Sequence, residues 1–407
     1  MCLYLPSQLF ILNLNKMNNT YLKSLSLFFC ASALFSCEDD APIVSSISVP
    51  DTYSFLDASG ESTVSFSGQT TRLQQVDEIL TDLLTFGVTS EDLSEKFTEG
   101  EGFTDTTLNG TGKTVYSKIA ASDDYYKENA TESITIKTEI NSFIEDQISE
   151  ILGAYDALED VPEASEGVIG QLDDRLLNSQ GLEYNQMFAK SLVGALVLDQ
   201  VVNNYLSRCL DATYQEQNSN GELVESKNYT TLEHYWDEAY GYIYGNADND
   251  SLLYKYIVKV AADEDFAGID TQILDAFKLG RAAIVAQNYN VLENQVTTLR
   301  TLLSKVVGVR AIYYLQQGKA NLAYISANDA SAFHDLSEGY GFIYSLQFTR
   351  NPNTDAPYFT KEEVDAYLLN LTQDNGLWDL IGNTTILDTI SSEIATAFGV
   401  TVDEAGS

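Results

Sequence analysis

Two stretches of the chain nearly repeat each other: His234-Tyr-Trp-Asp-Glu238-Ala-Tyr-Gly241-Tyr-Ile-Tyr244 and His334-Asp-Leu-Ser-Glu338-Gly-Tyr-Gly341-Phe-Ile-Tyr344. In both, Glu stands four residues after His, Tyr six after and Gly seven after, and an aromatic residue, Ile and Tyr follow. The two stretches use both histidines of the 407-residue chain. A weaker echo precedes them, over residues 185–206 and 294–315. We interpret the pattern as an internal duplication.

Apolar residues recur at helical spacing from about residue 133 onward, most clearly over residues 140–155, 192–206, 273–284 and 299–315. Proline interrupts helices, and the chain has six prolines in all, so long helices are compatible with the sequence. We therefore predict a mainly α fold, built as a duplicated helical bundle. Its halves, residues 133–268 and 269–407, are expected to pack face to face about an approximate two-fold axis.

The first residues resemble an export signal rather than part of the fold. Residues 1–36 contain an apolar run that is shorter than a membrane span, and Met17 is a better start than the first Met. Leu34-Phe-Ser-Cys37 resembles a bacterial lipobox, so Cys37 is expected to be lipidated. Residues 37–62 would then form a tether. Residues 63–132 are expected to hold a short extended strand at 63–66, a helix and a long loop.

This signal predicts a protein that is lipid-anchored at the outer membrane. Acidic residues follow Cys37 directly, which resembles a surface-export signal of some Gram-negative lipoproteins. The periplasmic side and the cell surface both remain open. The lipid would be the contact with the membrane, since the rest of the chain behaves as a soluble body. The alternative is a soluble secreted protein that is cleaved nearby.

The chain is strongly acidic, with 60 Asp and Glu residues against 22 Lys and Arg residues and a formal charge of −38. This balance excludes nucleic acid as a partner, because phosphate contacts need cations that the chain lacks. Metal cations or cationic ligands would be attracted instead. The sequence has no His-Glu-x-x-His motif, no Gly-x-Ser-x-Gly motif and no dinucleotide-binding glycine pattern. We therefore predict that the protein is not an enzyme.

The repeated motif supplies the candidate site residues. Residues four apart lie on one face of a helix, so His234 is predicted to lie beside Glu238, and His334 beside Glu338. Asp237 adds a carboxylate next to Glu238. Imidazole and carboxylate groups on bundle helices are ligands for iron, manganese or zinc, and a two-fold axis could bring the two pairs together. One metal site, two sites or none are all compatible with the sequence.

A structural role is the alternative for the same motif. The His–Glu pairs would then form hydrogen bonds on the helix surface, and Gly241 and Gly341 would sit where two helices cross closely. The sequence alone leaves this interpretation and the metal site about equally favoured.

Four stretches, spread over nearly all of the mature chain, carry a resemblance to a known family: Ser65-Phe-Ser-Gly-Gln-Thr70, Gly181-Leu-Glu-Tyr-Asn-Gln186, Glu233-His-Tyr-Trp-Asp-Glu-Ala-Tyr-Gly241 and Gly280-Arg-Ala-Ala-Ile284. They resemble an uncharacterised lipoprotein family of Gram-negative bacteria, a domain of unknown function that is often found beside imelysin-like proteins and outer-membrane receptors. The stretch with Trp-Asp-Glu-Ala is the specific one. The resemblance implies a fold similar to the two helical bundles of imelysin-like proteins, and an outer-membrane receptor or an imelysin-like protein as a partner.

The chain departs from the imelysin signature, Gly-x-His-x-x-Glu, at both copies of its motif. His234 and the acidic Asp237 match the signature, whereas Leu232 stands at the Gly position. Around His334 the two flanking positions hold Ala332 and Ser337. The resemblance therefore implies iron or haem handling at the envelope, and it does not support the peptidase activity that imelysins have been given.

Two functions of different classes follow. The first is an envelope lipoprotein that binds a metal ion or haem, with iron, zinc and haem as the possible ligands, as part of iron acquisition. The second is a non-catalytic structural or partner-docking module of the outer-membrane surface.

Overall fold

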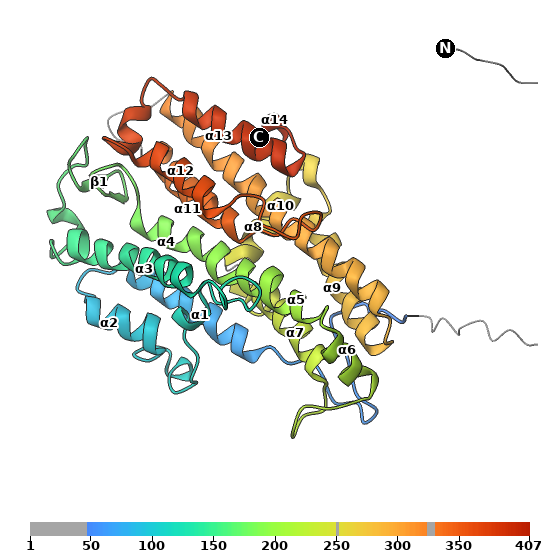
Figure 1. The fold of residues 1–407 in the computed structure, drawn as a ribbon. Helices are drawn as coiled ribbons and strands as arrows, with labels where there is room; N and C mark the ends of the chain where they lie inside the picture. Colours follow the sequence, from blue (N-terminus) through green and yellow to red (C-terminus); the bar gives the residue numbers. More distant parts are fainter. Residues whose placement is uncertain (1–46, 250–251, 324–329) are drawn as a thin grey trace, which may run out of the picture. The chain divides into compact units, whose positions relative to one another are not determined.

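Helices make up most of the protein, as the periodicity predicts (Figure 1). The computed structural model describes residues 47–249, 252–323 and 330–407. The predicted signal peptide and the lipidated Cys37 lie outside these residues. Residues Ser46–Ser407 form one compact unit. The division of the body into halves at residue 268 therefore stays a prediction about ancestry.

The α-helices are α1 (Ser67–Asp82), α2 (Ser90–Ser94), α3 (Ala130–Gln147), α4 (Tyr184–Leu192), α5 (Leu206–Arg208), α6 (Ala212–Ser219), α7 (Thr231–Tyr244), α8 (Leu252–Ala261), α9 (Ile269–Val285), α10 (Tyr289–Leu322), α11 (Ser331–Ser345), α12 (Lys361–Thr372), α13 (Thr385–Phe398) and α14 (Val402–Ala405). Wider π-helical turns form η1 (Glu95–Glu99), η4 (Ile148–Leu152) and η6 (Val193–Tyr205). Short 3₁₀ turns form η2 (Thr106–Leu108), η3 (Tyr116–Lys118), η5 (Leu158–Asp160), η7 (Ala247–Asn249), η8 (Glu264–Phe266), η9 (Leu346–Phe348) and η10 (Gly376–Leu380).

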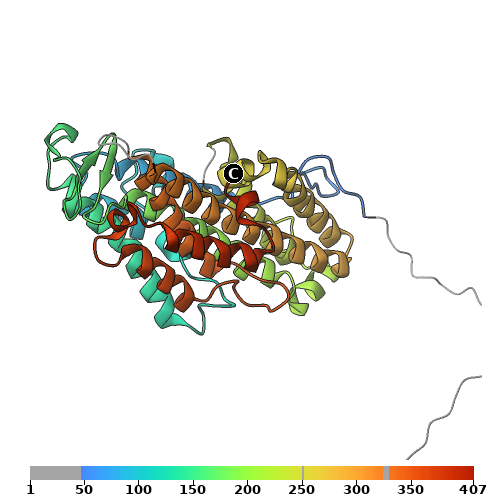
Figure 2. The same cartoon turned by 90° about the horizontal axis from the view of Figure 1, so that it is seen from above.

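A single antiparallel hairpin supplies the strands found in the described chain, β1 (Gly170–Leu172) and β2 (Arg175–Leu177). The hairpin lies at one end of the helical body (left in Figure 2). Among the described residues, no helix combines the length and the apolar character that a membrane span requires.

The long helix α10 organises the packing of the bundle. It contacts α9, α11 and α13, and α11 in turn packs on α4 (Figure 1). The helix α7 packs on η6, α9 and α1. Each histidine is the fourth residue of its helix, His234 in α7 and His334 in α11. The two copies of the motif therefore occupy equivalent positions on their helices but contact different neighbours.

The N-terminal segment differs from its sequence-based prediction in one respect. Residues 63–66 are not part of a strand, and an isolated bridge between Leu56 and Ser62 precedes them. The reason is that side chains of α7 satisfy the backbone here. The Ser65 N–H donates to Asp237 Oδ2 at 3.2 Å, and His234 Nδ1 lies 3.1 Å from the Ser65 carbonyl oxygen. The predicted long loop after α1 also contains α2 and η1.

Gly241 and Gly341 lie at close approaches between elements, as predicted. A Cβ atom at Gly241 would lie 2.4 Å from Phe66 Cβ, beside the start of α1. A Cβ atom at Gly341 would lie 2.4 Å from Lys190 Cβ of α4. Any side chain at either position would force its neighbour away.

A third glycine fixes α9 against α7. The fully buried ring of Trp236 lies over Gly280, where a Cβ atom would be 2.0 Å from Trp236 Cζ2. The Trp236 Nε1–H donates to the Phe277 carbonyl oxygen at 2.9 Å. The indole is thus held by its hydrogen bond and has no room to retreat.

We expect Gly280→Ala to lower the free energy of unfolding by about 1–3 kcal/mol, the usual cost of overpacking a core. Urea unfolding followed by circular dichroism measures it. Gly339→Ala is the matched control, because the nearest atom to a Cβ at Gly339 would be 3.5 Å away. That variant should be neutral, or more stable by up to about 1 kcal/mol through helix propensity. Equal effects at the two positions would contradict the packing.

Candidate functional site

The side chain of His234, on α7, contacts a backbone carbonyl oxygen, a carboxylate and an aromatic ring. A carbonyl oxygen can only accept, so the contact with Ser65 puts the proton of the neutral imidazole on Nδ1. His234 Nε2 lies 3.9 Å from Glu238 Oε1, and Glu238 accepts a hydrogen bond from Gln69 Nε2 at 2.9 Å. The Tyr229 ring stacks on the imidazole with the ring centroids 5.0 Å apart. The predicted His234–Glu238 pair therefore faces the N-terminal segment and α1.

The third predicted residue of this helix, Asp237, belongs to a buried ion-pair network. Asp237 and Arg281 are both fully buried, and Arg281 Nε donates to Asp237 Oδ1 at 3.0 Å. The same guanidinium donates to Glu233 Oε1 at 2.8 Å and to Thr63 Oγ1 at 2.9 Å. The Tyr53 hydroxyl donates to Asp237 Oδ1 at 2.7 Å. The network fastens the segment around residues 53–65 onto α7 and α9.

The second histidine has a different partner. His334 Nδ1 lies 2.8 Å from Oε1 of Glu183, a side chain at the start of α4 that is 2% exposed. Because the carboxylate accepts, the neutral imidazole carries its proton on Nδ1 and the lone pair of Nε2 is free. No hydrogen bond to Nε2 is formed among the described residues. The buried carboxylate orients the ring in the way that second-shell partners orient metal-bound histidines.

Glu338 pairs with α4 rather than with His334. Lys190 Nζ lies 2.9 Å from Glu338 Oε1, and both side chains are buried. Burial by itself would raise the pKa of Glu338. The Lys190 charge and hydrogen bonds from Lys190 and Tyr314 outweigh burial and lower the pKa of Glu338 to about 2. This carboxylate is therefore ionised at neutral pH.

Asp335, next to His334, behaves in the opposite way. Burial raises the pKa of Asp335 to about 6, and a hydrogen bond from Asn321 Nδ2 at 2.7 Å only partly offsets it. Asp335 is thus the acid of this region that titrates just below neutral pH.

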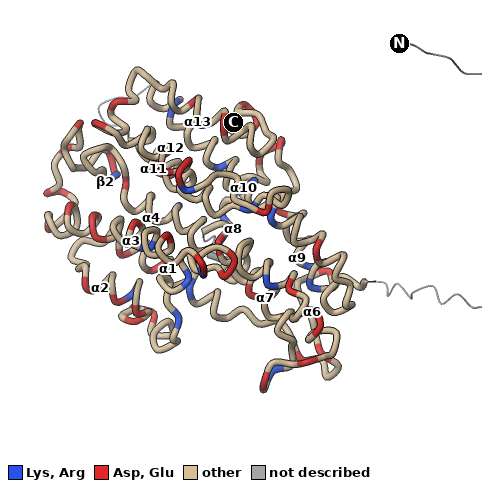
Figure 3. The backbone as a smooth tube through the Cα atoms, viewed as in Figure 1, with Lys and Arg blue, Asp and Glu red and all other residues tan. Residues whose placement is uncertain are grey.

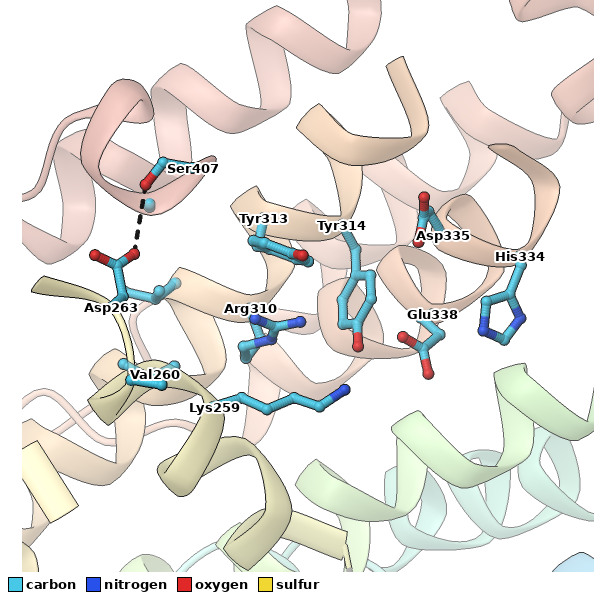
Figure 4. Close-up of a pocket in the computed structure, with 13 residues that line it drawn as sticks. Lys259, Val260, Asp263, Arg310, Tyr313, Tyr314, His334, Asp335, Glu338 and Ser407 are labelled. Atoms are coloured by element: carbon cyan, nitrogen blue, oxygen red, sulfur yellow. Dashed lines mark hydrogen bonds between the residues drawn. The ribbon is translucent and has the colours of Figure 1, made fainter. Parts of the chain in front are cut away.

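His334, Asp335 and Glu338 line a cavity of about 690 Å³ (Figure 4). Its walls come from α8, α10, α11 and the C-terminal residues near α14. The wall residues that carry polar groups are Lys259, Asp263, Arg310, Tyr313, Tyr314, His334, Asp335, Glu338 and Ser407. A volume in this range is typical of sites for small molecules and cofactors. His234 does not line this cavity.

The predicted ligands do not form a preassembled metal site. In residues 47–249, 252–323 and 330–407, no group of three or more His, Cys, Asp and Glu side chains could hold a metal ion. Asp237 is engaged by Arg281, and Glu338 by Lys190. Within the described residues, the predicted ligands are thus engaged by other side chains and do not converge on one point.

Sequence reasoning missed the partners of the motif residues. Glu183 and Arg281 lie within two of the stretches that carry the family resemblance, but the pattern did not show what they contact. Lys190 and Arg310 were also missed. A signal existed for all three cations: in a chain with 22 Lys and Arg residues, each stands on an otherwise apolar helix face.

We expect Asp237→Asn to lower the free energy of unfolding by about 3–5 kcal/mol, because it deprives the buried Arg281 guanidinium of its fully buried carboxylate and leaves it only the more exposed Glu233. Chemical denaturation monitored by circular dichroism measures this. The control Glu238→Gln removes a partly exposed carboxylate from the same helix and should cost less than about 1 kcal/mol.

The double variant Asp237→Leu/Arg281→Met removes both charges at once and should recover much of the loss. If Asp237→Asn were as mild as Glu238→Gln, the buried pair would not hold this segment in place.

The raised pKa of Asp335 gives a pH-dependent prediction. An acid whose pKa is higher in the folded state destabilises that state once it is ionised, and this loss grows as the pH rises from about 4 to about 6. Asp335→Asn keeps an acceptor for Asn321 and removes the charge. The variant should therefore have a higher melting temperature than the wild type at pH 7.5 and the same one near pH 4. Differential scanning fluorimetry tests it, and a difference that does not change with pH would contradict the raised pKa.

Comparisons with known proteins identify a family but no characterised relative. The comparison with curated proteins and the comparison with solved structures give no match. A family model described as "Domain of unknown function (DUF4856)" matches residues 50–401, which include both histidine motifs and the residues that line the cavity except Ala405 and Ser407. The chain belongs to this family of domains of unknown function.

Proposed function

We propose that this protein is a non-catalytic envelope lipoprotein that binds haem, or a similar metal complex, in the cavity beside His334. The observation that carries the proposal is the geometry of His334. Its Nδ1 is held by the buried Glu183 carboxylate, its Nε2 is free, and the ring lines a cavity of cofactor size.

The side chains that could bind a metal favour haem over a free metal ion as the ligand. Zinc and similar transition-metal ions usually take three or four protein ligands, and the described residues offer no such group. Haem brings the four nitrogen ligands of its own macrocycle and needs one axial residue from the protein. His334 can supply that ligand, and the rings of Tyr313 and Tyr314 give the cavity aromatic surface.

The contacts of the two histidines differ, and this difference supports ligand binding at only one of the two motifs. His234 has its Nδ1 on a backbone carbonyl oxygen and its ring against Tyr229, and its carboxylate neighbour Asp237 is neutralised by Arg281. These contacts support the structural interpretation for α7. The docking-module function is thus the second candidate, because the His234 region fastens the N-terminal segment instead of lining a cavity.

The location and the role in iron acquisition rest on the sequence. The lipobox-like Leu34-Phe-Ser-Cys37 supports lipidation at Cys37 and an outer-membrane location. Enzymatic activity, including peptidase activity, is not part of the proposal. An outer-membrane receptor or an imelysin-like protein is the proposed partner, on the strength of the family resemblance.

Titration of the purified protein with ferric haem should produce a shifted Soret band with a saturable endpoint of one haem per chain. His334→Ala should abolish the shift, because it removes the axial nitrogen. Glu183→Gln should weaken binding by about 10–100-fold, as is usual when the partner that orients a ligating histidine is changed.

His234→Ala is the matched control, since it is the same substitution at the same position of the twin motif. It should leave the haem spectrum and affinity unchanged while lowering the melting temperature. Equal spectra for wild type and His334→Ala, or loss of binding in His234→Ala alone, would refute the assignment of the site.

A further inference from the structure

The cavity beside His334 contains a buried cation that has no anionic partner. Arg310 is 5% exposed and lines the cavity from α10. It forms no hydrogen bond or ion pair within the described residues, and its buried Nε has no partner. By contrast, the buried Arg281 donates to two carboxylates. A buried polar group without a partner is costly, so an uncompensated guanidinium beside a cavity points to a ligand.

The Arg310 guanidinium contacts two tyrosine rings, and its buried Nε has no hydrogen-bond partner within the described residues. Its Cζ lies 3.9 Å from the ring centroid of Tyr313 and 4.5 Å from that of Tyr314. The two ring centroids are 5.3 Å apart and their planes are nearly perpendicular, so the guanidinium lies beside both rings and not between them (Figure 4). Contacts with aromatic rings stabilise the charge of a guanidinium but are not hydrogen bonds to oxygen acceptors, so the N–H donors still lack such partners in the described chain. Those donors match the two oxygens of a carboxylate.

Arg310 is one of four cations gathered around a single ring. Lys190, Lys255, Lys259 and Arg310 all lie within about 6 Å of the centroid of the Tyr256 ring. Lys190 is paired with Glu338, whereas the other three form no ion pair among the described residues. Such a cluster stands out in a chain of formal charge −38, whose acidic residues occur throughout the fold (Figure 3).

Lys259 shares the cavity with Arg310. Figure 4 shows its side chain extending from α8 toward the centre of the cavity. Partial desolvation lowers the pKa of Lys259, and the charges of Lys255 and Arg310 add to this effect, whereas the charge of Glu338 opposes it. A bound anion would stabilise the charged form of Lys259 and thereby counteract both the desolvation and the repulsion between the cations.

Within the described residues no acid of the cavity forms an ion pair with Arg310 or Lys259, although the Glu338 charge acts on Lys259, and Asp335 and Arg310 attract each other, at longer range. Glu338 is taken by Lys190, and Asp335 lies beside His334 on α11, where it accepts from Asn321. Asp263 contacts Ser407 near the C-terminus. The cavity thus has a histidine end and a cationic part, with ionised carboxylates already engaged elsewhere.

We infer that the cavity contains an anion subsite in which Arg310, assisted by Lys259, binds a carboxylate group of the ligand. The inference deepens the proposed function, since it rests on the same cavity, but it does not require iron. In the haem case the carboxylates are those on the edge of the porphyrin, which would turn toward Arg310 while the iron meets His334.

The decisive experiment uses metal-free full-length protein and small probes without a porphyrin. Isothermal titration with succinate should give saturable binding in the millimolar range or tighter, whereas succinamide, its uncharged analogue, should not bind. Arg310→Gln should weaken succinate binding by about tenfold or more, as expected for loss of a charge-assisted bidentate contact. Lys259→Gln should weaken it by a smaller factor.

Lys137→Gln is the charge-matched control. Lys137 also lies over a tyrosine ring and has no ion-pair partner in the described chain, but it belongs to α3 and does not line the cavity. It should leave succinate binding unchanged. Arg310→Lys and the exposed Lys259→Gln keep the test valid if Arg310→Gln does not fold.

Three results would overturn the inference. The first is that succinate and succinamide bind equally well or that neither binds. The second is unchanged succinate affinity in Arg310→Lys and Lys259→Gln, and the third is tighter binding of inorganic phosphate than of succinate.

A second comparison separates this inference from the proposed function. Ferric haem should bind at least about tenfold more tightly than its dimethyl ester, and Arg310→Gln should erase that preference while keeping the His334-dependent Soret shift. Succinate binding without any haem binding would support the anion subsite and reject the haem site.

Discussion

One buried carboxylate–cation pair holds each histidine-bearing helix. On α7 it is Asp237 with Arg281 of α9, and on α11 it is Glu338 with Lys190 of α4. The chain has few cations, and these two lie inside the bundle. Each must face its carboxylate on another helix, so the two pairs determine that α7 lies beside α9 and α11 beside α4. Burying either cation without its carboxylate would strongly destabilise the folded protein. The positions of both histidines follow from these two pairs.

The two motifs occupy the same helical positions but make different contacts. On α7 the partner of the imidazole is the backbone of the N-terminal segment, and the surrounding polar groups are all used in holding that segment. On α11 the partner is the buried carboxylate of Glu183, which comes from another helix and leaves the far nitrogen of His334 beside a cavity. A duplicated unit that keeps one copy for stability and one for a ligand is consistent with the sequence of both stretches. The Trp-Asp-Glu-Ala residues of the first copy serve the Gly280 contact and the ion pair, and the second copy has Leu-Ser-Glu-Gly instead.

Much of the fold could be predicted from the sequence, because helical periodicity and the absence of proline act locally. The helices around residues 140–155, 192–206, 273–284 and 299–315 are present, and Gly241 and Gly341 lie at close approaches. The site could be predicted only in part. Periodicity places Glu238 and Glu338 one turn after each histidine, but it does not show that Lys190 and Gln69 engage them or that Glu183 reaches His334. These contacts join residues more than 140 positions apart, and no local pattern records them. The expected strand at 63–66 failed for a related reason, since side chains of α7 take the hydrogen bonds that a neighbouring strand would have made.

We propose that a metal complex is bound through His334 and not through His234. The most direct measurement is a crystal structure of the protein with ferric haem, with the iron located by anomalous scattering. The account predicts one iron atom per chain, bonded to Nε2 of His334, with the carboxylates of the porphyrin beside Arg310. Iron bonded to His234, iron shared between the two histidines, or an empty His334 cavity would contradict it.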